Sequence, residues 1–197
     1  MISGGATSIE DLAGLVSVRT SSGAITLARL SGVTTVATGS GDVTITAQSG
    51  AISVTTKSSR ISARDLAANV TARTGNGAVT LAYAGRGDAD VQTQSSGVDI
   101  EGLDGGLKAV TGSGHVRVTG APRSAWTIAT GSGAVDVILG GDASATVEAT
   151  TGGGSVRVDK AYLAGTIGPR RASGTINGGG PAMTLTSRSA TITIAGR

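Results

Sequence analysis

Short stretches of alternating apolar and polar residues recur along the whole chain, each following a glycine-rich corner such as ATGSGDVTI at residues 37–45. The first apolar residues after successive corners lie 16 to 21 positions apart, and 18 is the commonest step. These anchor positions are Ile25, Val43, Ile61, Val79, Val98, Val116, Val135, Val156, Ile176 and Ile192. A sustained period in this range is typical of a solenoid, in which each repeat forms one turn of a coil.

A second set of alternating stretches begins about halfway between the anchors, at Val16, Ile52, Val70, Leu107, Trp126, Val147 and Ile167. Because alternation at period two indicates strands, each coil should hold two short strands joined by two turns, and equivalent strands of successive coils should pair in parallel. The sequence therefore predicts an all-β fold, a right-handed parallel β-helix (β-solenoid) of about ten coils of ~18 residues. We expect a single array over residues 1–197, with no second domain and with one longer, irregular coil at 156–176.

A threonine stands just before the glycine phrase in eight coils, and the alternation places it on the inward face. A buried threonine at a strand end can bond the backbone of the adjoining corner, and glycine permits the backbone conformations that a tight corner needs. We therefore interpret the repeated phrase as a structural corner, since a phosphate-binding loop would need GxxxxGK and a following helix. The eight positions are Thr20, Thr38, Thr56, Thr74, Thr93, Thr111, Thr130 and Thr151.

Composition narrows the possible partners. The 197 residues include 33 glycines and no cysteine, and the formal net charge is +3 with the basic residues scattered, so we expect no nucleic-acid partner. No apolar run approaches the roughly 18 residues of a transmembrane helix. The only histidine, His115, cannot form a metal site alone, and we expect no cofactor.

The phrases TGSGDVTI, TGNGAVTL, TGSGHVRV and TGSGAVDV resemble the adhesin-like β-strand-repeat family of bacterial envelope proteins. The resemblance covers nearly the whole chain. It implies a single-stranded parallel β-helix, an extracellular or cell-envelope location, and no recognised set of catalytic residues. The opening residues MISGGATSIEDL do not read as a signal peptide, so an export signal would lie outside this chain.

Charged residues replace hydroxyls at the outward position after the anchor. The series Thr26, Thr44, Ser62, Thr80 continues as Asp99, Arg117, Asp136, Arg157. We favour a surface charge ladder on adjacent strands, each exposed pair contributing less than about 1 kcal/mol. The alternative is an acidic and basic cluster of a lyase-like enzyme that acts on an acidic polysaccharide.

The longest insertion, residues 159–172, carries Tyr162, Arg170 and Arg171. Departures from a repeat are common binding positions, so these residues are candidates for a surface contact with a glycan, a protein or another envelope component. A packing irregularity explains the insertion equally well.

The two ends of the array suggest self-association. An open coil presents unpaired backbone groups, and we expect Thr7 and Ile9 at one end and Ile192 and Ile194 at the other. The sequence thus favours a non-catalytic structural protein that associates with itself head to tail, as fibres do. The alternatives are a monomeric adhesin-type binding module, a processed piece of a longer protein and, third, a polysaccharide-acting enzyme.

Overall fold

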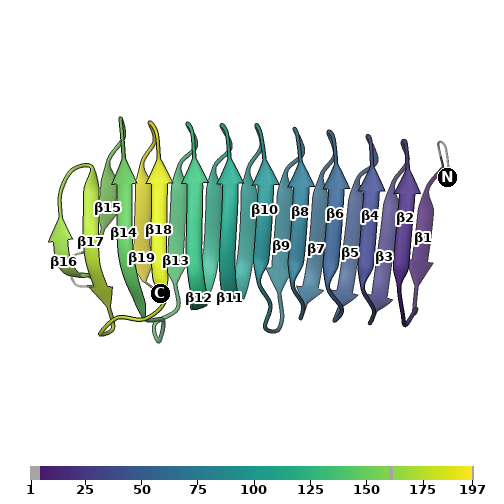
Figure 1. The fold of residues 1–197 in the computed structure, drawn as a ribbon, viewed down its shortest axis with the longest axis horizontal. Helices are drawn as coiled ribbons and strands as arrows, with labels where there is room; N and C mark the ends of the chain where they lie inside the picture. Colours follow the sequence, from purple (N-terminus) through teal and green to yellow (C-terminus); the bar gives the residue numbers. More distant parts are fainter. Residues whose placement is uncertain (1–4, 160–161, 197) are drawn as a thin grey trace.

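The computed structural model is an elongated parallel β-solenoid, which confirms the predicted all-β class (Figure 1). The structure describes residues 5–159 and 162–196. Within these ranges it has 19 strands and no helix, and hence no helix that could span a membrane. Most of the glycine corner expected at residues 3–5 lies outside the described residues, as do positions 160 and 161 of the long insertion.

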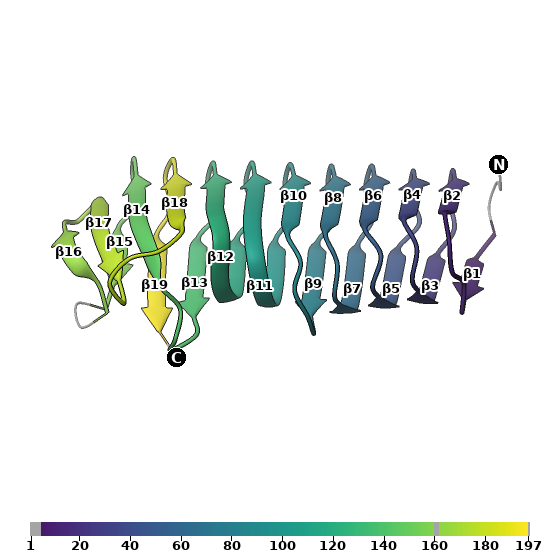
Figure 2. The same ribbon diagram turned by 60° about the horizontal axis from the view of Figure 1, so that its bottom comes forward.

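The strands form two faces (Figure 2), and the buried apolar side chains lie between them. Face A carries nine of the ten predicted anchor residues; the prediction is wrong for Ile176, which lies on face B in the antiparallel strand β17. In spatial order face A contains β1 (Thr7–Glu10), β3 (Ile25–Leu30), β5 (Val43–Gln48), β7 (Ile61–Leu66), β9 (Val79–Tyr83), the first parts of β11 (Val98–Thr111) and β12 (Val116–Thr130), β13 (Val135–Leu139), β19 (Ile192–Gly196) and β15 (Val156–Val158).

Face B lies opposite and contains the strands that end at the inward threonines. In spatial order these are β2 (Val16–Thr20), β4 (Thr34–Thr38), β6 (Ile52–Thr56), β8 (Val70–Thr74), β10 (Ala89–Thr93), the last parts of β11 and β12, β18 (Ala182–Ser187), β14 (Ala145–Thr151), β17 (Arg171–Ile176) and β16 (Ala164–Ile167). The long strands β11 and β12 bend from face A to face B (Figure 2).

Seven turns stack in the order of the chain, from β1 to β12. Each residue pairs with the residue about one period later: Val43 lies beside Ile61, and Ile61 lies beside Val79. The apolar positions of each strand point inward because the alternation matches the pleat, and the anchors through Val135 are all buried.

The remaining coils break the chain order, which corrects the predicted sequential stack of ten. Strand β18 lies between β12 and β14, and β19 lies between β13 and β15. The chain leaves β13, skips one position along the axis to form β14 and β15, and later returns to fill the skipped position (Figure 1). We call residues 182–196 the returning coil.

An antiparallel pair closes face B beyond β14. Strand β17 is antiparallel to β14, and β16 is antiparallel to β17. The turn between β16 and β17 crosses the adjacent corner, where the amides of Thr151 and Val156 donate to the carbonyls of Arg170 and Pro169. The long insertion thus covers backbone groups that a further coil would otherwise pair.

The inward threonine hydroxyls hold the corners between face B and face A. All eight are buried, and Ser187 continues the row in the returning coil. In seven of them the hydroxyl oxygen accepts a hydrogen bond from the amide three residues ahead: Thr38 from Gly41 (3.2 Å), Thr56 from Ser59 (3.2 Å), Thr74 from Gly77 (3.1 Å), Thr93 from Ser96 (3.4 Å), Thr111 from Gly114 (3.0 Å), Thr130 from Gly133 (2.9 Å) and Thr151 from Gly154 (3.1 Å). The Thr20 hydroxyl donates to the Ser22 carbonyl (2.8 Å).

The corners that lead from face A back to face B each contain one residue with a left-handed backbone conformation, which the sequence pattern did not reveal. Asp11, Arg29, Ala47 and Asp65, one per turn, have φ between 52° and 54°. Aspartate adopts this conformation more readily than most residues, but arginine and alanine do not, so the four positions share no residue-type signal. The turn geometry is repeated at the same position in four successive coils even though the side chains differ.

We expect Thr130→Val to destabilise the protein by about 1–3 kcal/mol, because the Gly133 amide and the Gly114 carbonyl would be buried without partners. Urea unfolding followed by circular dichroism measures this change. Thr127→Val, at an exposed position of the same strand, is the matched control and should change stability by less than about 0.5 kcal/mol. Equal effects of the two substitutions would show that the corner hydrogen bond is unimportant.

Candidate functional site

The outward side of face A combines a row of hydroxyls with a short charged segment. Thr26, Thr44, Ser62 and Thr80 lie on consecutive strands, and Asp99, Arg117 and Asp136 follow them in register. The charged segment is one position shorter than the sequence pattern suggests. Thr193 of the returning coil lies between Asp136 and Arg157, so the predicted adjacency of these two residues is wrong.

Arg117 lies opposite two carboxylates but forms an ion pair with neither of them in the described part of the chain. It lines a groove of about 430 Å³ that opens on face A, together with Glu101, Thr119, Tyr83 and Ile138. The groove forms where β11 and β12 bend, and Thr119 helps to shape it by accepting a hydrogen bond from the Gly102 amide (3.1 Å). The guanidinium of Arg117 forms no hydrogen bond or ion pair with any other residue that the structure describes.

His115 flanks the same segment. Its Nε2 lies 3.4 Å from Oδ2 of Asp99, and the two side chains are 54% and 40% exposed. This contact links the lone histidine to the first carboxylate of the ladder at an open, hydrated surface. Among the residues that the structure describes, no group of three or more histidine, cysteine, aspartate or glutamate side chains could hold a metal ion.

The residues expected at the ends of the array lie in different surroundings. Thr7 and Ile9 are half-buried on β1, whose one strand partner among the described residues is β3. Ile192 and Ile194 are not at an end: they are 0% and 1% exposed, between β13 and β15. The expectation that these two isoleucines form a self-associating end is wrong, because the returning coil is inserted inside the stack.

The insertion residues serve mainly to close the fold. Tyr162 is half-buried: its hydroxyl donates to the Gly140 carbonyl (3.0 Å), and its ring lies against Gly196 so closely that a side chain there would overlap it. It is therefore a packing residue and not a displayed contact, as the alternative interpretation held. Arg170 and Arg171 are exposed, and Arg171 donates to Oε1 of Glu148 (2.9 Å).

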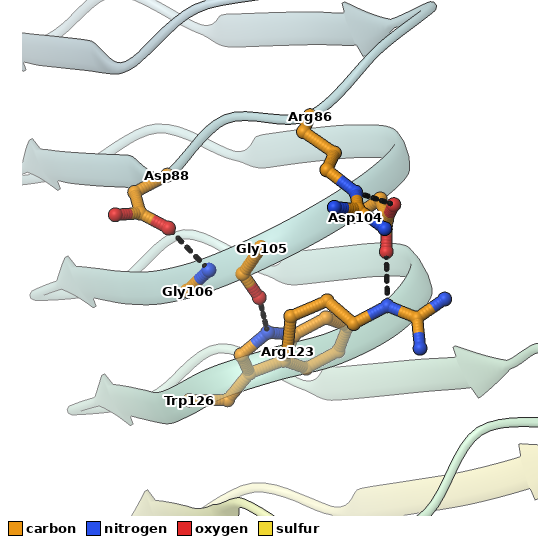
Figure 3. A network of polar contacts seen from close by, with 7 residues as sticks. All are labelled: Arg86, Asp88, Asp104, Gly105, Gly106, Arg123 and Trp126. Carbon is orange, nitrogen blue, oxygen red and sulfur yellow. Dashed lines mark hydrogen bonds and ion pairs between the residues drawn. The ribbon is translucent and has the colours of Figure 1, made fainter.

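A second polar network, absent from the sequence-based candidates, holds the bends of β11 and β12 together (Figure 3). Asp104 lies between two arginines and accepts hydrogen bonds from Arg123 (2.6 Å) and Arg86 (3.3 Å). The hydrogen bond from Arg123 is the main cause that lowers the pKa of Asp104, and Arg86 adds to it. Arg86 and Arg123 are 82% and 53% exposed, so this cluster is a hydrated clamp on the surface.

Behind this clamp, the backbone of the bend is fixed from inside. The indole Nε1 of the fully buried Trp126 donates to the Gly105 carbonyl (2.8 Å), and the Gly106 amide donates to Oδ1 of Asp88 (2.6 Å) (Figure 3). A buried indole needs such a partner, and the bend offers a free carbonyl to it. The network therefore fixes the bends of β11 and β12, which lie next to the groove in both strands.

The fold and its repeated corners define a parallel β-solenoid repeat domain. Residues 9–195 match the family model described as Toastrack DUF4097, and the chain belongs to this family. No curated protein and no solved structure matches the chain.

We expect the contribution of Asp104 to stability to depend on pH. Because its folded-state pKa is lowered below the ordinary 3.8, the stabilisation is complete above that value and is lost as the pH falls through the folded pKa. The stability difference between the protein and Asp104→Asn should therefore be constant from about pH 7 to 5 and shrink towards about pH 2.5.

Urea unfolding at several pH values measures this difference. Glu101→Gln is the control, since Glu101 forms no ion pair among the described residues. A difference for Asp104→Asn that does not change with pH would contradict the assignment.

Proposed function

We propose that this chain is a non-catalytic β-solenoid binding domain of the cell envelope or extracellular space, and that face A binds an acidic glycan at Arg117. The observation that carries the proposal is the unpaired guanidinium of Arg117 in an open groove of about 430 Å³. A planar guanidinium binds a carboxylate through two parallel hydrogen bonds, which a sugar acid can accept.

The surroundings of Arg117 suit a ligand that has both acid groups and hydroxyls. The carboxylates of Asp99 and Glu101 are hydrogen-bond acceptors and would receive bonds from sugar hydroxyls. The same carboxylates disfavour a densely charged polyanion through repulsion. A glycan with one acid group per several hydroxyls fits this mixture better than a phosphate polymer does.

The hydroxyl row extends the polar surface beyond the groove. Thr26, Thr44, Ser62 and Thr80 lead towards Asp99 on adjacent strands, with a spacing of about 4.8 Å per strand. An extended saccharide chain could lie along this row and place one acid group in the groove. The array supplies repeated weak polar contacts, and Arg117 supplies the single strong one.

The exposure of the ionisable groups supports binding over catalysis. The side chains of His115 and Asp99 are 54% and 40% exposed, whereas catalytic acids and bases usually work in a site that excludes water. Membership of the Toastrack DUF4097 family adds no enzymatic activity to this assignment. We therefore favour a binding domain over a polysaccharide-acting enzyme.

Isothermal titration with an oligosaccharide that carries a single uronic acid, and with the neutral methyl ester of that acid, tests the proposal. We expect the acidic form to bind, and Arg117→Ala to weaken binding roughly tenfold or more, because a charge-assisted hydrogen bond contributes about 1.5–3 kcal/mol. The matched control is Arg19→Ala, an exposed arginine on face B, which should leave the affinity unchanged. Equal affinity for both saccharides, or an equal loss of affinity in the Arg117→Ala and Arg19→Ala variants, would overturn the proposed site. Cleavage of the acidic saccharide would instead support the enzyme.

Self-association is a second candidate, favoured by the edge at β1 and β2. Each of these strands pairs on one side only within the described residues, and the inward hydroxyl of Thr7 has no hydrogen-bond partner there. Because β17 and β16 cover the other end of face B, a contact between two β1–β2 edges is now favoured over the head-to-tail fibre.

Ile9→Glu should abolish a contact at this edge, since it places a charge on the half-buried side of β1. Sedimentation over a concentration series measures the loss. Ser8→Glu, on the outward side of the same strand, should leave association intact. Association that survives Ile9→Glu would exclude this edge.

A further inference from the structure

The returning coil, residues 182–196, occupies a slot whose two walls come from earlier parts of the chain. On face B, β18 is in register with five residues of β12 on one side and six of β14 on the other. On face A, β19 is in register with five residues of β13 and three of β15. The slot thus takes up both backbone edges of an inserted segment, as a strand-acceptor site does.

The side chains of the returning coil match the slot closely. Met183, Leu185, Ile192 and Ile194 are at most 1% exposed, and they continue the core between the neighbouring coils. The Ser187 hydroxyl accepts a hydrogen bond from the Ala190 amide (2.9 Å), as the threonines do in the other corners. The segment therefore carries every feature that a rung of this solenoid requires.

The connection that leads into the returning coil, residues 177–181, is rich in glycine, and we call it the hinge. Residues 177–181 read NGGGP, and Asn177, Gly178 and Gly179 have φ of 49°, 80° and 95°. Three consecutive glycines allow many backbone directions, and little of this connection is buried. The same five residues could direct the segment into its own slot or away from it.

Parts of the chain outside the returning coil also join the two walls of the slot. Residues 140–144 connect β13 to β14 across the skipped position, and their carbonyls are bonded by two side chains. The side-chain Nδ2 of Asn177 donates to the carbonyls of Gly141 (3.2 Å) and Ala143 (2.8 Å). The Tyr162 hydroxyl donates to the carbonyl of Gly140. The walls are thus tied to the hinge and the insertion as well as to the inserted strands.

We propose that the slot between β12–β13 and β14–β15 also accepts the returning coil of a second copy of this chain, so that copies join by exchange of residues 182–196. A glycine-rich hinge, an inserted segment and a complete acceptor slot are the elements of such an exchange, which replaces every contact by an identical one between chains. Reciprocal exchange forms a closed dimer, and one-way exchange forms an open series. This proposal does not depend on the glycan site or on the β1–β2 edge.

Disulfide trapping in the full chain tests the exchange, because the chain has no cysteine of its own. Thr127 of β12 and Thr184 of β18 are exposed neighbours in register, at a separation suited to a disulfide. The double variant Thr127→Cys/Thr184→Cys is unfolded, refolded at a series of concentrations, oxidised and separated on a non-reducing gel. Thr35→Cys/Ser53→Cys is the control, since it joins β4 and β6, which follow each other in the chain order of face B.

We expect the ratio of interchain to intrachain disulfide to rise roughly tenfold for each tenfold increase in concentration in the Thr127/Thr184 variant. The control variant should stay intrachain. Deletion of Gly178 to Gly180 should raise the interchain fraction further, because a shortened hinge hinders insertion into the same chain.

A mixture of the two single variants gives an independent readout. Thr127→Cys and Thr184→Cys chains refolded together should form the mixed disulfide well above the level of the Thr35→Cys and Ser53→Cys mixture. Intrachain disulfides at every concentration, together with a mixed disulfide at the control level, would overturn the exchange. Dimers that Ile9→Glu abolishes while the Thr127–Thr184 disulfide stays intrachain would assign association to the β1–β2 edge instead.

Discussion

The hydrogen bond between a buried hydroxyl and the amide three residues ahead is the contact on which this solenoid depends. Each turn must reverse the chain within a few residues while its backbone amides are removed from water, and the threonine at the end of each face B strand supplies the missing acceptor. Thr74, Thr111 and Thr130 also donate to a carbonyl of the preceding corner, so one side chain fixes its own corner and joins it to the next. This repeated contact holds the corners in line, and the parallel pairing of the strands on both faces builds on it.

Periodicity revealed the strands and turns because they are properties of one coil. Alternation at period two, a corner glycine and an inward threonine recur locally, so the strands up to Val135 and the inward positions could be read from spacing alone. The spatial order of the last coils could not be predicted from the spacing. Every coil has nearly the same pattern, and a sequence such as SATITIAG would fit between any two neighbours. The irregular spacing of the last anchors and the NGGGP hinge were the only signs of a change in path.

The candidate site was only partly accessible to sequence reasoning. The alignment of Asp99, Arg117 and Asp136 follows from the period, since these coils stack in chain order. The groove does not, because it depends on the bends of β11 and β12 and on partners such as Trp126 and Gly105 that are 21 residues apart. Tyr162 shows the same limit: the insertion has no period, so its packing against Gly196 had no local signal.

The position of the returning coil also sets the order in which the molecule can be completed during translation. The turns from β1 to β11 pair only with partners made just before or just after them, so they can stack as the nascent chain emerges. Strands β14 and β15 cannot acquire their inner neighbours until residues 182–196 have left the ribosome. One part of the rod thus folds by adding coils one after another, and the other part is completed by a single late insertion. Until that insertion occurs, the walls of the slot are exposed and are the surfaces that a chaperone would meet.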